Sequence, residues 1–432
     1  MAYYAVQETK RLDADSLGRR ARVQHLLGEV ADQRGDLTAA LASFKQAYAS
    51  TAELLKRWPN SPQRMFDHSQ SAYWVGYIAW RRGQTPEAKA RFTEYMTLAR
   101  KLVAIDPKND DWQGELRFAN RNLGVVLFEN GKAEAAAAAF SDALRIDLQL
   151  VGRAPTDRDR LGELGQDYAW NADAQLQAGR LQGALQTRLS ERNIYLNILK
   201  QDPNDLEVKE ALVVNRLAVS RLYERNEDYD GAIAELELAE SGCKELIKSV
   251  PKNVGYQEHL VLIYQSMGSA LIGLKRYDAA SRSARRASQN AERLLSMDPT
   301  VAAWSGPGLG GARLLEVRAN ALAAKSPAEA AAAVAPSVAE FDRLSRLARR
   351  LPNDRQVARI AAEAALMAGD SYALSGNAPS ARETWSRGLR QLKEMGIYRK
   401  GEVQVILEKR QFERISDQAD FREYTSDYIN LY

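Results

Sequence analysis

The side chains best suited to bind another molecule lie in the stretch SAYWVGYIAWRR, residues 71–82. Tyr77 follows Tyr73 there by four residues, and Trp80 and Arg81 follow Tyr77 by three and four residues, spacings that place side chains on one face of a helix. Tyrosine, tryptophan and arginine contribute most of the binding energy at protein interfaces. This stretch therefore predicts a surface that binds a peptide or a protein.

A second group with binding potential consists of arginines, again three and four residues apart. The group comprises Arg282, Arg285 and Arg286 in one segment and Arg346, Arg349 and Arg350 in another. This spacing predicts basic stripes on helix faces, which would attract a phosphate group or an acidic partner. Aromatic residues do not alternate with the arginines, as stacking on nucleic-acid bases would require. A solvated helix face is the alternative interpretation.

Residues for catalysis or metal binding are scarce. The chain has three histidines, which we expect to be structural or surface residues, and one cysteine, Cys243, which we expect to be buried. It contains none of the short motifs of phosphate-binding loops, zinc proteases, thiol redox centres or serine hydrolases. The four glycines within residues 306–311 follow no predicted strand and favour a flexible joint. We expect no enzyme activity, no cofactor and no metal ion.

Composition limits the class of protein further. Of 432 residues, 45% are hydrophobic and 27% are charged, which is enough apolar content for a large core. Lys and Arg number 60 against 56 Asp and Glu, a balance unlike that of a nucleic-acid or membrane binder. There is no run of about 18 apolar residues, no signal peptide, and no pair of cysteines for a disulfide. We expect a cytoplasmic protein without membrane insertion.

Prolines mark a repeat of 48 residues. They occur at Pro59, Pro107, Pro155, Pro203, Pro251 and Pro299. Because the chain has only 13 prolines, six in one register cannot be chance. A turn signal rich in glycine, asparagine or aspartate lies midway between successive prolines. The next proline, Pro352, comes after 53 residues, and we place the extra residues in the glycine-rich stretch.

Between these marks, apolar residues recur with the period of a helix. Each unit is therefore predicted to contain two antiparallel helices, A and B. A small residue recurs in helix A, an alanine follows twelve residues later, and a large residue often follows four residues after that, as in Gly28, Ala40 and Phe44. Small residues let two helices approach closely, and the large residue fills the space beside them.

This spacing of small and large residues resembles the tetratricopeptide repeat (TPR), although the unit here is longer than the usual one of about 34 residues. The resemblance implies an all-α, right-handed α-solenoid of about eight antiparallel helix pairs with a C-terminal capping helix. Long units with turns such as Asp106-Pro107-Lys108-Asn109 look like bacterial arrays that follow an effector domain in signalling and defence proteins.

The repeat marks also predict the organisation of the chain. Residues 1–10 resemble the tail of a preceding helix, so we expect the array to begin in mid-motif. Repeats 1–6 are expected in residues 11–304, a glycine-rich joint in 305–311, and repeats 7–8 in 312–395. Residues 396–432 are expected to hold the capping helix and a polar tail with several tyrosines.

In a TPR protein the concave groove is lined mainly by helix A. The resemblance places eight residues of the second and third repeats there: Gln70, Tyr73, Tyr77, Trp80, Arg81, Phe118, Arg121 and Phe128. They would suit an extended peptide or a helix that carries an acidic residue. Packing between repeats is the alternative interpretation, and we favour it for Trp74. The carboxylate clamp of chaperone-binding TPRs is not matched, because His25 and Glu29 occupy its positions.

Taken together, these patterns predict a non-catalytic scaffold for protein–protein interaction. We expect it to be the sensor or regulatory arm of a larger bacterial signalling or defence protein, with a peptide or protein ligand in the groove. A fused or associated effector domain is expected, and homo-oligomers are left open. The alternative is a helical repeat that binds a nucleic acid or nucleotide through the basic stripes of helix B.

Overall fold

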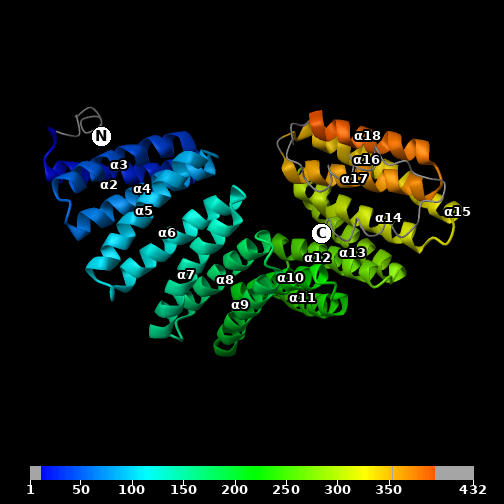
Figure 1. Cartoon of the computed structure of the whole chain (residues 1–432), viewed down its shortest axis with the longest axis horizontal. Coiled ribbons are helices and arrows are strands. Elements are labelled where there is room, and N and C mark those ends of the chain that lie inside the picture. The colour runs from blue at the N-terminus through cyan, green and yellow to red at the C-terminus, as the bar shows by residue number, and fades with distance from the viewer. Residues whose placement is uncertain (1–10, 353, 395–432) are drawn as a thin grey trace. The chain divides into compact units, whose positions relative to one another are not determined.

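The computed structural model describes residues 11–352 and 354–394. The predicted helix tail in residues 1–10 and the predicted capping helix and tail in 396–432 lie outside this part of the chain. Within the described residues, helices make up nearly the whole structure and no strand occurs (Figure 1). The prediction of an all-α solenoid of antiparallel helix pairs is confirmed.

Eight pairs of helices A and B follow one another along the described residues. The A helices are α2 (Ala14–Gln33), α4 (Pro62–Arg81), α6 (Asp110–Glu129), α8 (Arg158–Gln177), α10 (Leu206–Arg225), α12 (Val254–Gly273), η2 (Trp304–Gly310) continuing as α14 (Gly311–Ala323), and α17 (Arg355–Leu374). The B helices are α3 (Leu37–Arg57), α5 (Thr85–Ile105), α7 (Ala133–Arg153), α9 (Leu181–Gln201), α11 (Tyr229–Ser249), α13 (Tyr277–Met297), α15 (Pro327–Ala330) with η3 (Ala331–Ala333) and α16 (Val334–Arg350), and α18 (Ala378–Glu394).

The repeat length follows from the lengths of these parts. In the first six pairs helix A has 20 residues and helix B has 21, and linkers of three and four residues complete the unit. The longer linker contains the proline, which cannot continue the preceding helix because it lacks an N–H group. The last linker residue caps the next helix A: the side chains of Ser61, Asn109 and Asp205 each accept a hydrogen bond from a first-turn N–H group.

The shorter linker reverses the chain through one residue in the left-handed conformation. In the first four pairs this residue is glycine, whereas Glu227 and Lys275 adopt it in the fifth and sixth with φ of 59° and 57°. The amide of the following residue bonds back into the helix, as Asp36 does to the carbonyl of Ala31 at 2.9 Å. Glycine adopts this conformation without steric cost, and other residues do not.

We expect Lys275→Gly to raise the free energy of unfolding by about 1 kcal/mol, because the left-handed conformation costs a residue with a Cβ about 1–2 kcal/mol. Gly131→Ala should have the opposite effect, since Gly131 has φ of 69° and no neighbouring atoms that would clash with a methyl group. Urea unfolding followed by circular dichroism measures both changes. An unchanged midpoint for Lys275→Gly would contradict this account of the turn.

Close packing of helix A on helix B requires glycine in several pairs. A Cβ atom on Gly124 would lie 2.6 Å from a ring carbon of Phe140, well inside van der Waals contact. Phe140 is fully buried, as are Phe44 and Phe92 in the equivalent positions of the first two pairs. In the eighth pair Trp385 takes this place and is also fully buried.

Later pairs fill the same space differently. In the sixth pair Ala284 occupies the position of the large residue, and Leu315 of the next A helix approaches the glycine position instead. In the seventh pair helix A carries Arg318 where the others have a small residue, and Ser337 lies on helix B. Both side chains are buried. The contact between helices A and B is thus kept in all these pairs, while the side chains that fill it differ.

The expectation of a flexible glycine-rich joint at residues 305–311 is wrong. These residues form the π-helical turn η2 and the start of α14, and Gly306 and Gly310 are buried. A Cβ atom on Gly310 would lie 2.8 Å from the side chain of Leu344, so glycine serves close packing here rather than mobility. Gln265 Nε2 also donates to the carbonyl of Pro307 at 2.9 Å, which ties the turn to α12.

The extra residues of the seventh repeat lie within its helices. Its helix A runs over the 22 residues 302–323, because Ala302 and Ala303 are helical before η2, and its helix B runs over the 24 residues 327–350, including η3. These additions of two and three residues account for the longer proline spacing. Inserted residues are commonly absorbed as π-helical turns.

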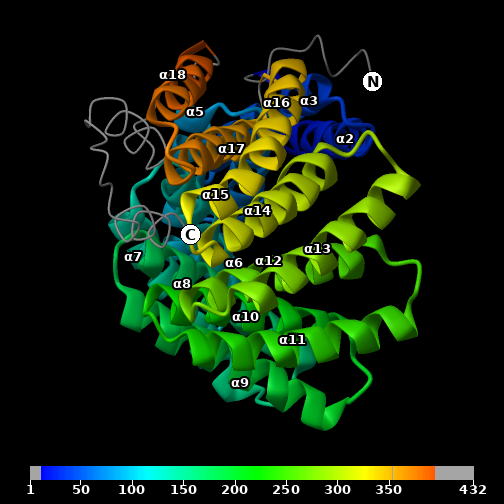
Figure 2. The same cartoon turned by 90° about the vertical axis from the view of Figure 1, so that its right-hand side faces the viewer.

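The chain divides into two compact units between Lys200 and Gln201. The first unit contains α2 to α9, and the second contains the helices from α10 to α18. In the second unit α14 packs between α13 on one side and α16 and α17 on the other (Figure 2). The largest apolar cluster of this unit surrounds Phe341, Leu366 and Trp385.

Candidate ligand-binding surface

The predicted binding residues of the second repeat form an aromatic band along α4. The rings of Tyr73 and Tyr77 stack with centroids 6.0 Å apart, and Tyr77 lies 6.0 Å from Trp80. The guanidinium of Arg81 lies 5.6 Å from the centre of the Tyr77 ring, within the range of a cation–π contact. Burial raises the pKa of the Tyr73 phenol. Each ring remains half-buried, so part of the band faces solvent.

The polar ends of this band join α4 to the neighbouring A helices. Gln70 Nε2 donates to Glu115 at 2.7 Å, and Trp80 Nε1 donates to Glu129 at 2.6 Å; both acceptors belong to α6. Arg81 forms an ion pair with Asp32 of α2. Trp74 stacks on Phe44 at 5.0 Å, so the packing interpretation of Trp74 is confirmed. The α4 residues therefore hold repeats together as well as forming a surface.

On α6, Phe118 presents its ring to solvent and is 37% exposed. The guanidinium carbons of Arg117 and Arg121 lie 3.9 and 5.0 Å from the ring centre. An exposed ring held by two guanidinium groups forms a site that attracts an aromatic side chain of a ligand. Further along α6, Phe128 contacts Trp170 of α8 edge to face at 6.2 Å.

A buried group of charges lies beneath Phe118. Arg117 Nε is 3.1 Å from Asp147 of α7, and Arg117 Nη1 is 3.7 Å from Asp167 of α8. Arg121 contacts the same Asp167 at 3.2 Å and Glu163 at 2.9 Å. This group, which we name the α6–α8 charge cluster, joins the third repeat to the fourth. It orients the two guanidinium groups that flank Phe118.

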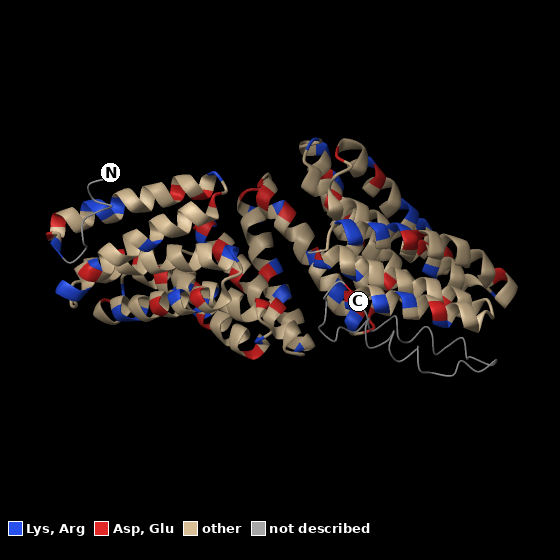
Figure 3. Cartoon of the chain, turned by 90° about the horizontal axis from the view of Figure 1, so that it is seen from above, with Lys and Arg blue, Asp and Glu red and all other residues tan. Residues whose placement is uncertain are grey.

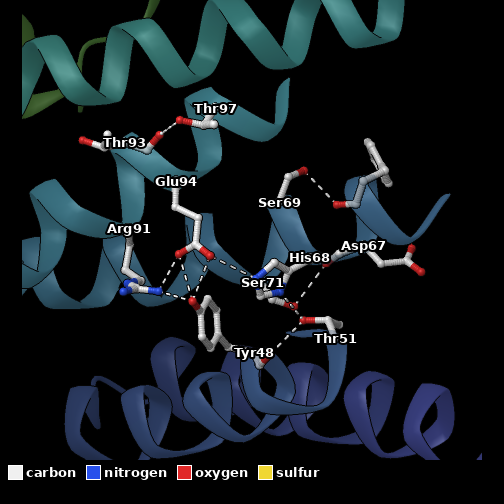
Figure 4. A network of polar contacts seen from close by, with 11 residues as sticks. Tyr48, Thr51, Asp67, His68, Ser69, Ser71, Arg91, Thr93, Glu94 and Thr97 are labelled. Carbon is white, nitrogen blue, oxygen red and sulfur yellow. Dashed lines mark hydrogen bonds and ion pairs between the residues drawn. The ribbon is translucent and has the colours of Figure 1, made fainter. Parts of the chain in front are cut away.

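A second polar network joins the first repeat to the second (Figure 4). His68 Nδ1 lies 2.9 Å from Thr51 Oγ1, and His68 Nε2 lies 3.1 Å from Glu94. Burial raises the pKa of Glu94, but hydrogen bonds from His68 and Tyr48 outweigh this, so that it is lowered overall. Burial also raises the pKa of Tyr48, to about 12.

A hydroxyl, an imidazole and a carboxylate in this order also occur in nucleophilic enzymes. Here the Thr51 hydroxyl is 4% exposed and donates to the backbone carbonyl of Tyr48 at 3.1 Å. Its oxygen is not presented to a substrate. The arrangement serves packing between repeats, as we expected for His68.

No protein-family model and no curated protein sequence matches the chain. Solved structures with the same arrangement of helices do match. The apo form of RapI has a TM-score of 0.54 at 10% identity, covering 88% of this chain and 98% of RapI. The apo quorum sensor NprR from B. thuringiensis has a TM-score of 0.53 at 11% identity, covering 88% and 89%. A tetratricopeptide repeat protein from Parabacteroides merdae has a TM-score of 0.42 at 14% identity, covering 80% and 99%.

The chain has a TPR-like fold of helical repeats. At these identities the likeness concerns the fold. In the described part of this TPR-like protein, no helix is both long and apolar enough to cross a membrane, and no group of three or more acidic, histidine or cysteine side chains is arranged to hold a metal ion. Cys243 is fully buried, and its thiol donates to the carbonyl of Tyr256.

The predicted basic stripes of the TPR-like protein lie on separate B helices, α13 and α16. Arg285 pairs with Glu316 at 2.8 Å, and Arg286 lies 5.8 Å from the centre of the Tyr264 ring. The remaining arginines of the stripes, Arg282, Arg346, Arg349 and Arg350, are exposed. Basic and acidic residues alternate along many of the helices (Figure 3), so part of the stripe is neutralised by its neighbours.

Sequence reasoning missed the α6–α8 charge cluster. The sequence does contain a signal for it, a charged residue at a repeat position that is otherwise apolar. Asp147 occupies the position that holds Ala99 in the second repeat and Cys243 in the fifth, and both of these residues are fully buried. A charged residue at a core position of a repeat must find counter-charges, because burying an unpaired charge is costly. The pairing with Arg117 supplies them.

Proposed function

We propose that this TPR-like protein is a non-catalytic scaffold that binds a peptide or protein segment on the A-helix surface of α4 and α6. The observation that carries the proposal is the exposed Phe118 ring packed against two guanidinium groups on the same helix, α6. Rigid aromatic and arginine side chains lose little entropy on binding and form most interface hot spots.

We further propose that the chain acts as the sensor arm of a bacterial, cytoplasmic signalling or defence protein. The quorum sensor NprR shares this fold, which supports a sensing role. Sequencing the coding region on both sides of these 432 residues tests the effector part of the proposal. An in-frame effector domain is the expected result, and stop codons on both sides would contradict a fused arm.

Binding is tested with a displayed peptide library selected on the full chain. The strongest selected peptide is then titrated against variants by fluorescence anisotropy. Phe118→Ala is expected to weaken binding about thirtyfold, the effect of one hot-spot residue worth about 2 kcal/mol. Tyr77→Ala/Trp80→Ala should weaken it at least as much. Phe118 donates no side-chain hydrogen bond, so its truncation leaves the pairs between repeats in place.

The matched control is Arg346→Ala/Arg349→Ala/Arg350→Ala on α16, which should leave peptide affinity unchanged. Circular dichroism of each variant shows that it is folded. Peptides that bind wild type and Phe118→Ala equally would contradict the proposed surface. Salt-sensitive binding of single-stranded RNA that is lost in the α16 variant would instead support the alternative of nucleic-acid binding by the basic stripes.

A further inference from the structure

The α6–α8 charge cluster has more acidic groups than basic ones. Arg117 and Arg121 of α6 face Asp147 of α7 and both Asp167 and Glu163 of α8. If every group were ionised, two positive charges would face three negative charges. The side chains of Asp147 and Asp167 are 4% and 0% exposed, so water cannot compensate the excess.

Glu163 forms ion pairs with both arginines and neutralises part of their positive charge. It lies at 2.9 Å from Arg121, contacts Arg117 as well, and is 35% exposed. Burial raises its pKa, but the two guanidinium groups outweigh burial and lower it overall. Glu163 is therefore ionised at neutral pH, and the negative excess falls on the buried pair.

The buried pair can remove this excess by holding one proton between two carboxyl groups. Asp147 and Asp167 both contact the guanidinium of Arg117, and Asp147 Oδ2 is buried and accepts no hydrogen bond. Because two neighbouring buried carboxyl groups disfavour ionisation of both, one proton held between them would partner this oxygen and remove one negative charge. With one proton, the five groups sum to zero charge. Burial and the neighbouring carboxyl raise the pKa of Asp147 to about 8, in agreement with this count.

The same cluster supports the proposed binding surface. The guanidinium groups of Arg117 and Arg121 are held by the acids on one side and contact the Phe118 ring on the other. When the shared proton leaves, two buried carboxylates repel each other and compete for the guanidinium groups. The Phe118 ring then no longer packs against guanidinium groups in fixed positions.

We propose that Asp147 and Asp167 form a shared proton site whose deprotonation shifts Arg117 and Arg121 and with them the Phe118 ring. The consequence for ligand affinity, which falls as the proton is lost, rests on the proposed function. The proton site and the movement of the ring do not.

Infrared difference spectroscopy of the full chain tests the proton site. We expect wild type to show the carbonyl stretch of a neutral carboxylic acid at about pH 6 and to lose it by about pH 10. Asp147→Asn and Asp167→Asn should each lack this band. Asn can still donate to the remaining carboxylate, which mimics the protonated acid. Asp142→Asn, on the exposed side of α7, is the control and should keep the band.

Local stability provides a second measurement. An aspartate has an ordinary pKa of about 4, whereas the pKa of Asp147 in the folded protein is raised to about 8. Between these two pH values the folded state binds the proton and the unfolded state does not. The free energy of unfolding therefore falls as pH rises from about 4 to about 8 and is level above that. The opening constant of α7 amides in hydrogen exchange should rise by up to about tenfold per pH unit, after correction for intrinsic exchange. Asp147→Asn should abolish this slope.

A fluorinated phenylalanine at position 118 tests the link to the surface. We expect its fluorine resonance to shift with the midpoint of the carboxyl band in wild type and to stay constant in Asp147→Asn. Absence of a neutral-acid band in folded wild type would overturn the proton site. A constant fluorine resonance would overturn the link. Neither result depends on whether a peptide binds, so a failure of the proposed function is recognised separately by the library titration.

Discussion

Arg117→Met is expected to lower the free energy of unfolding around the third and fourth repeats by about 3–5 kcal/mol. Arg117 is 4% exposed, and it is the closest counter-charge of Asp147 and a partner of Asp167. Its removal would leave the buried Asp147 without its arginine partner, and Arg121 alone to compensate Asp167 and Glu163. Urea unfolding together with hydrogen exchange of α6, α7 and α8 measures the loss and shows where it occurs.

Arg145→Met is the matched control for this change. Arg145 pairs with Asp142 at 3.3 Å, but the two side chains are 62% and 47% exposed, so we expect a loss of no more than about 0.5 kcal/mol. The cost of Arg117→Met should shrink as pH falls, because a protonated carboxyl needs no counter-charge. Equal losses for the two variants would show that burial of the cluster contributes nothing.

Trp385→Ala is expected to destabilise the eighth helix pair by about 3–5 kcal/mol, the usual cost of truncating a large buried aromatic side chain. The indole fills the space opposite Gly369, and its Nε1 donates to the carbonyl of Leu366 at 3.3 Å. Thermal unfolding followed by circular dichroism measures the effect. Trp58→Ala is the control, because Trp58 lies at the end of α3 and is 43% exposed.

The same site allows a rescue. Gly369→Met/Trp385→Ala places the large side chain on helix A and the small one on helix B, in the space that the Trp385 indole now fills beside Gly369. We expect this double variant to recover part of the lost stability, although Gly369→Met alone would clash with the indole. A double variant less stable than Trp385→Ala would argue against exchange of volume between the two helices.

Much of the fold could be predicted because its turns and close approaches require particular residues. Proline ends helix B, and glycine occupies left-handed turns and helix crossings, so these residues mark the repeat. The same chemistry misled the prediction at residues 305–311. Glycine suits both a mobile joint and a crowded helix, and only the neighbour Leu344, distant in sequence, distinguishes the two cases. Additions within a helix leave no turn signal.

The candidate surface was predictable only in part. The spacing on α4 predicted which residues share a face, but not that Arg81 pairs with Asp32 or Trp80 with Glu129, since these partners lie one repeat away. Contacts of this kind depend on how consecutive A helices align. Arg121 was predicted as a groove residue, but the cluster beneath Phe118 was missed because its acids lie on two other helices, α7 and α8.

The changing occupants of the space between helices A and B have a consequence for recombination of the gene. The first three units share a glycine on helix A and a phenylalanine on helix B, so duplication or loss of a 48-residue unit among them leaves each such pair intact. In the sixth unit the space beside Gly268 is filled by Leu315 of the seventh unit. A copy of the sixth unit inserted elsewhere without the seventh would therefore have a void at Gly268. The packing of glycine on phenylalanine therefore survives duplication or loss of a unit among the first three, whereas the sixth unit must be inherited together with the seventh.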